Sequence, residues 1–514
     1  MTLPMPPPQD MPAGEALDCA WLLPDPGSSA ALENVRIVIS SGRVQAVTPL
    51  LQAPAGPRLL ALPALSNAHD HARTVRSATL GAFGQPLESW LPFFSGILPG
   101  VDPYLCAVTS LARSARQGAT HVMVHYTRVQ GIGSYLEEAQ AVARAARDVG
   151  VRIGFAVGMR DRHGIAYGAD EQVLAALRPG IRAAVAGRLS VRPVSPAQQL
   201  AVVDEVASMV SADEGGTLAQ HMTVQYGPTG VQWCGTPLLE AIARASADTG
   251  RPVHMHLLET RYQRDWADRA HPEGIVRFLD DIGLLSERLT LAHCTWARPC
   301  ELALLAERGV TIAVNTSSNL GLKSGVAPVA EMLRQGCRVA MGLDGMALDE
   351  DDDALREMRL GYLLHRGWGY DVDMTRAQLW AFAAHHGRRS VNGAGPAGAP
   401  SAHIVAGAPA DLLVLDWEAL DNHSLFGGVD PLDLLLARAN GSHVAQVWAS
   451  GRCIVRDGRL LTLDETALRM ELHAQLRAAL GAHDGADSWR STLKALAEDL
   501  GPFYRRGIHL AGCC

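Results

Sequence analysis

The sequence predicts an α/β fold built on a (β/α)8 TIM-like barrel. Short apolar runs rich in β-branched residues alternate with amphipathic helical stretches, and eight such runs can be counted along the chain. Many successive runs start about one strand–helix unit apart, which is the spacing that a parallel sheet with crossover helices requires. The predicted barrel strands are, in order, Leu60–Leu65, His121–Tyr126, Arg152–Gly158, Met222–Gly227, Pro252–Leu258, Leu289–Cys294, Thr311–Asn315 and Val339–Asp344.

The two ends of the chain resemble each other outside this barrel. Residues 35–47 and 444–455 each contain a strand, a Ser-Gly-Arg turn and a second strand, and residues 410–417 form another apolar run. We therefore expect a small β-sandwich-like domain assembled from residues 1–58 and 400–465, with the barrel over residues 59–399. Residues 392–402 are rich in Gly, Pro and Ala and predict a linker, and residues 466–514 predict a C-terminal helical extension.

The composition favours a globular protein that acts on a small molecule. The chain has 514 residues, of which 48% are hydrophobic, and its net charge of -8 argues against a nucleic-acid-binding surface. No apolar run approaches the roughly 18 residues that a membrane-spanning helix needs, and the first residues lack the features of a signal peptide, so we expect a cytoplasmic protein without a membrane partner. The nine cysteines contain no C-x-x-C pair, which argues against a disulfide framework or a cysteine zinc site.

Histidines and carboxylates stand at the ends of several predicted strands. The chain has 19 histidines, so the pair His69 and His71 is common by chance, and its place beside the first strand carries more weight. Further groups end the fifth, sixth and eighth strands: His256, Glu259, His293 and Asp344. Catalytic groups of such a barrel lie at the C-terminal ends of its strands, so these residues together predict a metal-dependent active site.

Several motifs resemble those of the amidohydrolase superfamily, in the branch that contains cytosine, guanine and S-adenosylhomocysteine deaminases and triazine hydrolases. In chain order they are SNAHDHAR at the first strand, HLLET at the fifth, LAHCTW at the sixth, the loop NTSSNLGLKSGVAPV, and MGLDG at the eighth. The resemblance extends over about residues 30–460 and includes the composite sheet, but it does not cover the tail from residue 466.

The resemblance implies a role for each site residue. One divalent metal ion, with zinc favoured over iron, would be bound by His69, His71, His256 and Asp344. Binuclear members of the superfamily bridge two metals with a carboxylated lysine on the fourth strand. MTVQYG has no lysine there, and the only lysines of the chain are Lys323 and Lys494, so a mononuclear site follows. Relatives are often dimers or larger, which implies a homo-oligomer.

The residue types predict hydrolysis by a metal-bound hydroxide. Three imidazoles and one carboxylate can hold a divalent ion and leave a position for water, whose pKa can then fall to about 7. Asp344 would accept the proton of this water, and Glu259 would protonate a ring nitrogen of the substrate. His293 would orient the hydroxide and stabilise the developing oxyanion. The predicted reaction is the hydrolytic deamination of a nitrogen heterocycle.

The substrate pocket is less well specified. Thr229 stands where many relatives carry the histidine of a P-H-S/A-P motif, which weakens the interpretation of a purine or adenosine substrate. In the same loop, Gln232 could pair with the edge of a heterocycle and Trp233 could stack on its face, or the loop could simply pack on the barrel. Further candidates for substrate contact are His125, Arg160, Gln85, Trp90 and Asn319. His254 is better explained as a hydrogen-bonded interior histidine than as a ligand.

Two other functions stay open. The same nucleophile could displace a halide, thiol or alkylamine from a triazine-like ring, or cleave a carbamate or urea, because the pocket rather than the motifs decides the leaving group. A barrel that only binds a ligand is disfavoured, since a metal-binding module would not require Glu259 at the family spacing.

Overall fold

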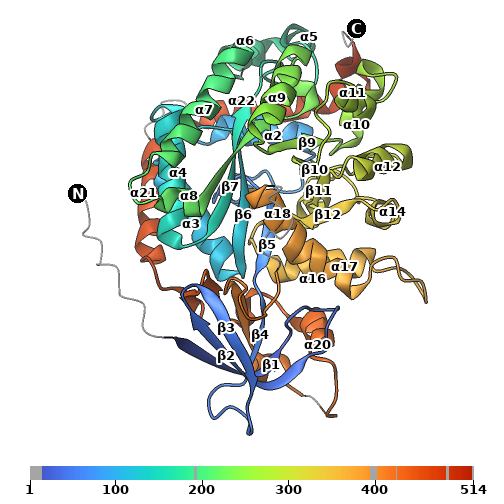
Figure 1. Cartoon of the computed structure of the whole chain (residues 1–514). Helices are drawn as coiled ribbons and strands as arrows, with labels where there is room; N and C mark the ends of the chain where they lie inside the picture. Colours follow the sequence, from blue (N-terminus) through green and yellow to red (C-terminus); the bar gives the residue numbers. More distant parts are fainter. Residues whose placement is uncertain (1–13, 190–193, 394–401, 424, 482–485, 512–514) are drawn as a thin grey trace.

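The computed structural model describes residues 14–189, 194–393, 402–423, 425–481 and 486–511. Eight parallel strands follow one another in space in their sequence order (Figure 1). Backbone amides of Leu343 and Asp344 donate to the carbonyl of His69, which joins the last strand to the first. The strands are β5 (Leu65–Asp70), β6 (Ala119–Tyr126), β7 (Arg152–Met159), β8 (Met222–Pro228), β9 (Val253–Leu257), β10 (Leu289–His293), β11 (Thr311–Val314) and β12 (Arg338–Met341). The predicted (β/α)8 barrel is confirmed.

The prediction that Leu60–Leu65 forms the first barrel strand is wrong. This run covers β4 (Leu59–Pro63), which belongs to a second sheet, and the first barrel strand is β5. Both strands are almost entirely buried, so one apolar run continues through two elements and its pattern does not mark the boundary. As a consequence, His69 lies within the first barrel strand instead of after it.

The second sheet is built from both ends of the chain, as predicted. Its strand order is β16-β15-β14-β13-β4-β1-β2-β3. The two predicted hairpins correspond to β2–β3 and β14–β15, which pair in antiparallel fashion. The remaining bounds are β1 (Glu15–Leu22), β2 (Leu32–Ser40), β3 (Arg43–Pro49), β13 (Leu412–Asp416), β14 (Val444–Ala449), β15 (Arg452–Arg456) and β16 (Arg459–Leu460). The domain boundaries stay a proposal. The small β domain would comprise residues 1–58 and 400–465, the barrel residues 59–399, and the C-terminal extension residues 466–514.

A buried ion pair links this sheet to the barrel. Arg388 donates to the carboxylate of Asp411 at 3.1 Å and to the carbonyl of Ala64 at 3.1 Å. Asp411 also accepts from the backbone amide of Ser450 at 2.7 Å. Since Ala64 stands between β4 and β5, the pair fixes the point where the chain passes from one sheet to the other.

Helices surround the barrel and begin and end at recognisable signals. For example, α4 (Tyr135–Val149) starts with a capping box between Ser134 and Glu137 and ends at Gly150, whose φ is 93°. The other helices on or near the barrel wall are α3 (Pro103–Arg116), α7 (Pro196–Ser211), α8 (Thr217–His221), α9 (Thr236–Thr249), α10 (Arg261–Ala270), α11 (Ile275–Asp281), α12 (Pro299–Glu307), α13 (Thr316–Gly321), α14 (Val329–Arg334), α15 (Met346–Asp349), α16 (Ala354–His365), α17 (Arg376–Trp380) and α18 (His386–Asn392). The helices α19 (Trp417–Leu420) and α20 (Pro431–Arg438) follow β13.

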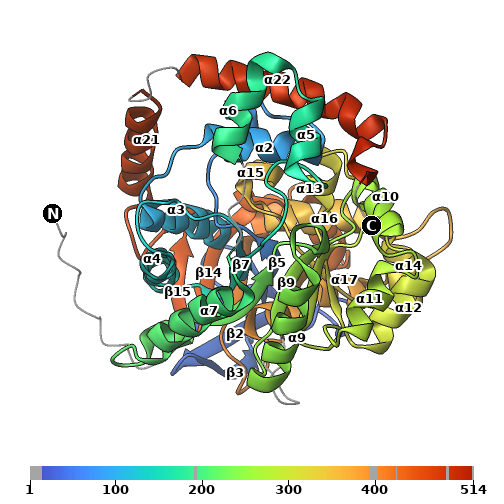
Figure 2. The same ribbon diagram turned by 90° about the horizontal axis from the view of Figure 1, so that it is seen from above.

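Inserted helices and the C-terminal segment cover the catalytic end of the barrel. After β5 come α1 (Ser77–Leu80) and α2 (Leu87–Ile97), and after β7 come α5 (Asp170–Ala176) and α6 (Pro179–Leu189). The C-terminal α22 (Ala486–Arg505) packs on α2, α5 and α6, and α21 (Glu465–Gly481) packs on α3 (Figure 2).

Some predicted segments fall outside the described residues. Of the predicted linker 392–402, residues 394–401 are among these. Within the described part of the chain, no helix combines the length and the apolar character that crossing a bilayer demands.

Candidate metal and catalytic site

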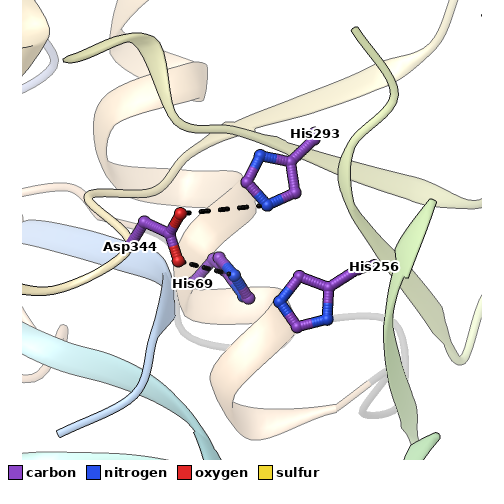
Figure 3. Close-up of side chains that lie close together, drawn as sticks. All are labelled: His69, His256, His293 and Asp344. Carbon is purple, nitrogen blue, oxygen red and sulfur yellow. Dashed lines mark ion pairs between the residues drawn. The ribbon is translucent and has the colours of Figure 1, made fainter. Parts of the chain in front are cut away.

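The strand ends bring three of the predicted metal ligands together with His293, which was predicted to stabilise the oxyanion. His69 lies in β5, His256 in β9 and His293 at the end of β10, while Asp344 follows β12 by three residues. Their side chains converge inside the barrel mouth (Figure 3). Potential ligand atoms of these four residues all lie within 4.8 Å of one another, and every one of the four side chains is buried.

His71 joins this group through Asp344. Nε2 of His69 and Nε2 of His71 each lie 3.1 Å from the same oxygen, Oδ1 of Asp344. The ring of His256 has its centroid 4.8 Å from that of His69 and 5.4 Å from that of His71. Three imidazoles and one carboxylate therefore face a common point.

Contacts on the far side of each ring fix its orientation. Nδ1 of His71 lies 2.7 Å from the carbonyl oxygen of His125, and Nδ1 of His256 lies 2.7 Å from that of Thr229. Nδ1 of His69 lies 2.7 Å from Nε2 of His254. A carbonyl can only accept, so Nδ1 carries the hydrogen in His71 and His256, and Nε2 presents its lone pair to the centre.

Glu259 and His293 stand beside this centre. Nε2 of His293 lies 3.6 Å from Oε2 of Glu259 and 3.9 Å from Oδ2 of Asp344. Nδ1 of His293 is 2.8 Å from Oδ1 of Asn319, which accepts its hydrogen. Asn319, predicted as a substrate contact, thus holds His293 in place.

Burial and charge set the protonation of the cluster. Burial lowers the pKa of His69 to about 4 despite the attraction of Asp344, and burial lowers the pKa of His256 well below its usual value. Burial opposes ionisation of Asp344 too, but the neighbouring histidines hold its pKa well below the ordinary range. Burial is the largest cause that raises the pKa of Glu259 well above that of an ordinary glutamate, and the charge of Asp344 adds to it. These pKa shifts favour neutral imidazoles at His69 and His256, an ionised Asp344 and a protonated Glu259.

The backbone is strained at two of these strand ends. His293 has a φ of 75° and Asp344 a φ of 65°, in the left-handed region that residues other than glycine seldom adopt. Such a conformation costs about 1–3 kcal/mol per residue and is often found at active sites. The neighbouring Gly342 has no space for a side chain, because a Cβ there would come within 2.9 Å of Cβ of His69.

The other predicted pocket residues are mostly buried in packing contacts. Trp233 is 5% exposed, packs edge-on against Tyr167 at 5.6 Å, and has the guanidinium of Arg160 over its ring at 5.9 Å. The indole nitrogen of Trp90 donates to Ser77, and the ring stacks on Phe94 at 4.5 Å.

Three further residues that were predicted to contact the substrate have buried polar atoms. His125 is buried, with Nε2 3.0 Å from the carbonyl oxygen of Gly227. Nε2 of Gln232 and Oε1 of Gln85 are buried without a hydrogen-bond partner among the described residues. None of these contacts tests whether the residues touch a substrate, so that role stays a prediction.

The sequence analysis missed several residues that support the cluster. The hydroxyl of Ser318 donates to Oδ2 of Asp344 at 2.7 Å, and that of Ser324 donates to Oε1 of Glu259 at 3.2 Å. Both serines belong to the loop motif NTSSNLGLKSGVAPV, so this motif could have identified them as site residues. Glu88, which accepts from Thr260 at 2.5 Å and from Tyr167 at 3.0 Å, had no comparable sequence signal.

The fold and this cluster define a class: a (β/α)8 barrel with a buried imidazole–carboxylate site that can hold a divalent ion. The chain belongs to the amidohydrolase family, whose family model matches residues 60–454. The resemblance seen in the motifs is thereby confirmed.

Similar proteins in this family are named as deaminases. The 5'-deoxyadenosine deaminase of Methanothermobacter thermautotrophicus is 28% identical over 83% of this chain and 88% of that protein. The 5-methylthioadenosine/S-adenosylhomocysteine deaminase of Pyrococcus furiosus is 26% identical over 85% of this chain and 95% of that protein.

Solved structures share the fold. A zinc-bound adenosine deaminase from Xanthomonas campestris superimposes with a TM-score of 0.70 at 23% identity, covering 93% of this chain and 98% of its own. The zinc complex of an atrazine chlorohydrolase from Arthrobacter aurescens gives a TM-score of 0.65 at 21% identity, covering 89% of this chain and 98% of its own.

Proposed function

We propose that this chain is a mononuclear metal-dependent aminohydrolase that removes an amino group from a nitrogen heterocycle. The observation that carries the proposal is the convergence of three imidazoles on Asp344, with Glu259 buried close by, next to His293. The family, and relatives that are named as deaminases of adenosine derivatives, support the same reaction class.

The donor set fits one divalent ion. Nε2 of His69 and Oδ1 of Asp344 are buried and have no hydrogen-bond partner among the described residues. Neutral imidazoles and a carboxylate are ligands that zinc and iron both accept, and we propose zinc. The strand β8, which would supply a bridging lysine in a binuclear site, contains none.

The ligands we propose are His69, His71, His256 and Asp344. His293 also lies within reach, but it faces the other oxygen of Asp344 at a longer distance and stands closer to Glu259. His71 shares Oδ1 of Asp344 with His69 at 3.1 Å. This difference supports a role for His293 toward the substrate instead of as a ligand.

A divalent ion in this site would lower the pKa of a water molecule and polarise the carbon under attack. The lowered pKa of Asp344 favours its carboxylate form, which can take up the proton of that water, while the hydroxyl of Ser318 donates to its second oxygen. The raised pKa of Glu259 favours its protonated form, which can donate to the ring nitrogen next to the attacked carbon. Nε2 of His293, whose Nδ1 donates to Asn319, can accept a hydrogen bond from the hydroxyl that is added to the carbon. Asp344 can pass the proton that it took up to the amino group, which then leaves as ammonia, and Glu259 can take back a proton from the added hydroxyl as the carbonyl product forms.

A screen for ammonia release tests this proposal. Metal-loaded protein is incubated with aminopyrimidines, aminopurines, pterins and aminotriazines, and chloride and alkylamines are measured in parallel. We expect ammonia from at least one class. Release of chloride or alkylamine without ammonia would favour the displacement reactions, and no product from any compound would contradict both. We also propose a homo-oligomer, which rests on the family resemblance, and a cytoplasmic location.

A further inference from the structure

Two histidines and one aspartate meet where the second sheet contacts the helices of the barrel. Asp25 follows β1 by three residues, His385 ends the π-helical turn η2 (Ala381–His385) between α17 and α18, and His403 precedes β13. Figure 1 shows β1 below α17 and α18. None of these three residues takes part in the reaction proposed above.

The donor atoms of the three side chains face one another. Potential ligand atoms of Asp25, His385 and His403 all lie within 4.8 Å of one another. Oδ1 of Asp25 lies 3.3 Å from Nδ1 of His403 and 3.8 Å from Nε2 of His385, and the centroids of the two rings are 4.6 Å apart. In a tetrahedral zinc site, neighbouring donor atoms are about 3.3 Å apart, because each lies about 2.0–2.1 Å from the ion. The pair of Asp25 and His403 already has this separation, and the pair of Asp25 and His385 must shorten by about 0.5 Å.

The charges around this group favour a cation. Among the described residues, no arginine or lysine lies within 4.0 Å of the carboxylate of Asp25, which has the two histidines as its ionisable neighbours. Burial, helped by the proximity of His403, lowers the pKa of His385 to about 4, so this ring is neutral at pH 7. Arg388, which also lowers this pKa, is paired with Asp411. Neutral imidazoles and a carboxylate are common ligands of zinc.

The group is open to solvent, and part of it is held in place by the backbone. The side chains of Asp25, His385 and His403 are 24%, 22% and 31% exposed, so an ion can enter from solvent and water can complete its coordination. The backbone amide of Ile404 donates to the carbonyl of Pro24 at 3.0 Å. The segments that carry Asp25 and His403 are therefore paired before an ion binds.

Binding at His385 changes one hydrogen bond. The backbone amide of Ala402 donates to Nδ1 of His385 at 3.1 Å, so Nε2 carries the hydrogen of the neutral ring. An ion at Nε2 requires this hydrogen to move to Nδ1 and the contact with Ala402 to open. In the catalytic cluster, by contrast, Nδ1 of His71 and of His256 faces a carbonyl and already carries the hydrogen. The group at the junction should therefore bind an ion more weakly than the catalytic cluster.

We propose that Asp25, His385 and His403 form a second metal site, the junction site, which binds one zinc ion and joins the second sheet to the barrel. The ion connects three segments that are far apart in the sequence: the chain after β1, the turn before α18 and the chain before β13. This inference does not rest on the proposed function, because it concerns other residues. Since the catalytic cluster binds zinc more tightly and fills first, catalytic activity still saturates at one equivalent of zinc.

Zinc binding to the full chain tests the junction site. Metal-free protein is titrated with zinc, and equilibrium dialysis separates bound from free zinc. We expect a second zinc ion per chain that binds more weakly than the first. His403→Ala and Asp25→Asn should each weaken the second binding step by about 10-fold or more, at least the effect of losing a group that only orients a ligand, and leave the first step unchanged. His473→Ala removes an exposed histidine of α21 and is the matched control, which should bind both ions like the unsubstituted protein.

Thermal unfolding gives a second readout. Because the ion joins separate segments of the folded chain, zinc beyond the first equivalent should raise the melting temperature of the unsubstituted protein and of His473→Ala, but not that of His403→Ala. Melting temperatures without zinc show whether each variant folds. Binding of a single zinc ion by the unsubstituted protein would contradict the junction site. So would a second zinc ion that binds His403→Ala and Asp25→Asn as tightly as the unsubstituted protein.

A variant of the catalytic cluster separates this inference from the proposed function. His71→Ala should weaken the first binding step and abolish ammonia release, while the weaker step that depends on His403 stays the same. If the weaker step is present but no compound is deaminated by the unsubstituted protein, the junction site stands and the proposed function is wrong. If ammonia is released and the only zinc ion bound is the one that depends on His71, the junction site is wrong and the function stands.

Discussion

Nε2 of His254 lies 2.7 Å from Nδ1 of His69, and the two rings stack with centroids 5.0 Å apart. For Nε2 of His69 to face Asp344 with its lone pair, Nδ1 must carry the hydrogen and donate it to His254. The neutral state of His254 makes this possible, since burial lowers its pKa well below the usual value. His254 is therefore a partner of a proposed ligand, in line with the prediction of an interior hydrogen-bonded histidine.

Replacing His254 tests this relationship. We expect His254→Ala to weaken zinc affinity by about 10–100-fold, the usual effect of losing a partner that orients a ligand. Zinc affinity is measured by competition with a chelator. His221→Ala is the matched control, because His221 bonds the carbonyl of Val151 at the other end of the barrel. Equal effects of both substitutions would contradict the role of His254.

Glu259 is expected to act in proton transfer without holding the metal. Glu259→Gln keeps the shape of the side chain but removes the acid, so kcat should fall by about 100-fold or more while bound metal stays the same. Glu301→Gln serves as a control, since Glu301 is a buried glutamate that binds Arg264. Turnover of Glu259→Gln at the level of the unsubstituted protein would remove Glu259 from the mechanism.

The ion pair of Arg388 and Asp411 should stabilise the junction of the two sheets. Arg388→Met leaves a buried carboxylate without its partner, which typically costs about 3–5 kcal/mol of unfolding free energy. Arg36→Met, at the exposed pair of Arg36 and Asp18, should cause a much smaller loss. Denaturant unfolding measures both, and equal losses would contradict the structural role of the junction.

The same pair predicts a dependence on pH. Burial opposes ionisation of Asp411, but Arg388, His121 and the backbone amide of Ser450 together outweigh burial and hold the pKa of Asp411 below its ordinary value. A carboxylate with a lowered pKa in the folded state stabilises the protein above its unfolded-state pKa. This contribution should be lost as the pH falls through the folded-state pKa, and Arg388→Met should lose less stability over that acidic range.

Substitution of Trp233 distinguishes whether its loop contacts the substrate or only packs on the barrel. The ring is 5% exposed and packs on Tyr167, so Trp233→Ala should lower stability by about 3–5 kcal/mol, as for other large aromatic side chains in a core. If the ring also stacks on the substrate, KM should rise by the equivalent of about 1–3 kcal/mol with metal content unchanged. An intact KM with a lowered melting temperature would exclude the substrate contact.

Sequence periodicity located the barrel strands well where a polar turn separates neighbouring elements. It failed at Leu60–Leu65, because β4 and β5 form one buried apolar stretch and only tertiary pairing divides them. The cluster residues could be predicted because strand ends of a parallel barrel meet at one face. The partners of these residues could not, since contacts such as Ser318 with Asp344 depend on how a loop folds back. The positions of α22 over the catalytic end and of α21 against α3 could not be predicted either, because a helical pattern does not say where a helix docks.

The central claim is that one divalent ion per chain supports hydrolytic deamination, and a metal titration tests it most directly. Protein freed of metal by a chelator is titrated with zinc, and the rate of ammonia release is measured on the best substrate of the screen. We expect the rate to rise linearly and to reach its plateau at one equivalent of zinc per chain. A plateau at two equivalents, or ammonia release that does not depend on metal, would contradict the account.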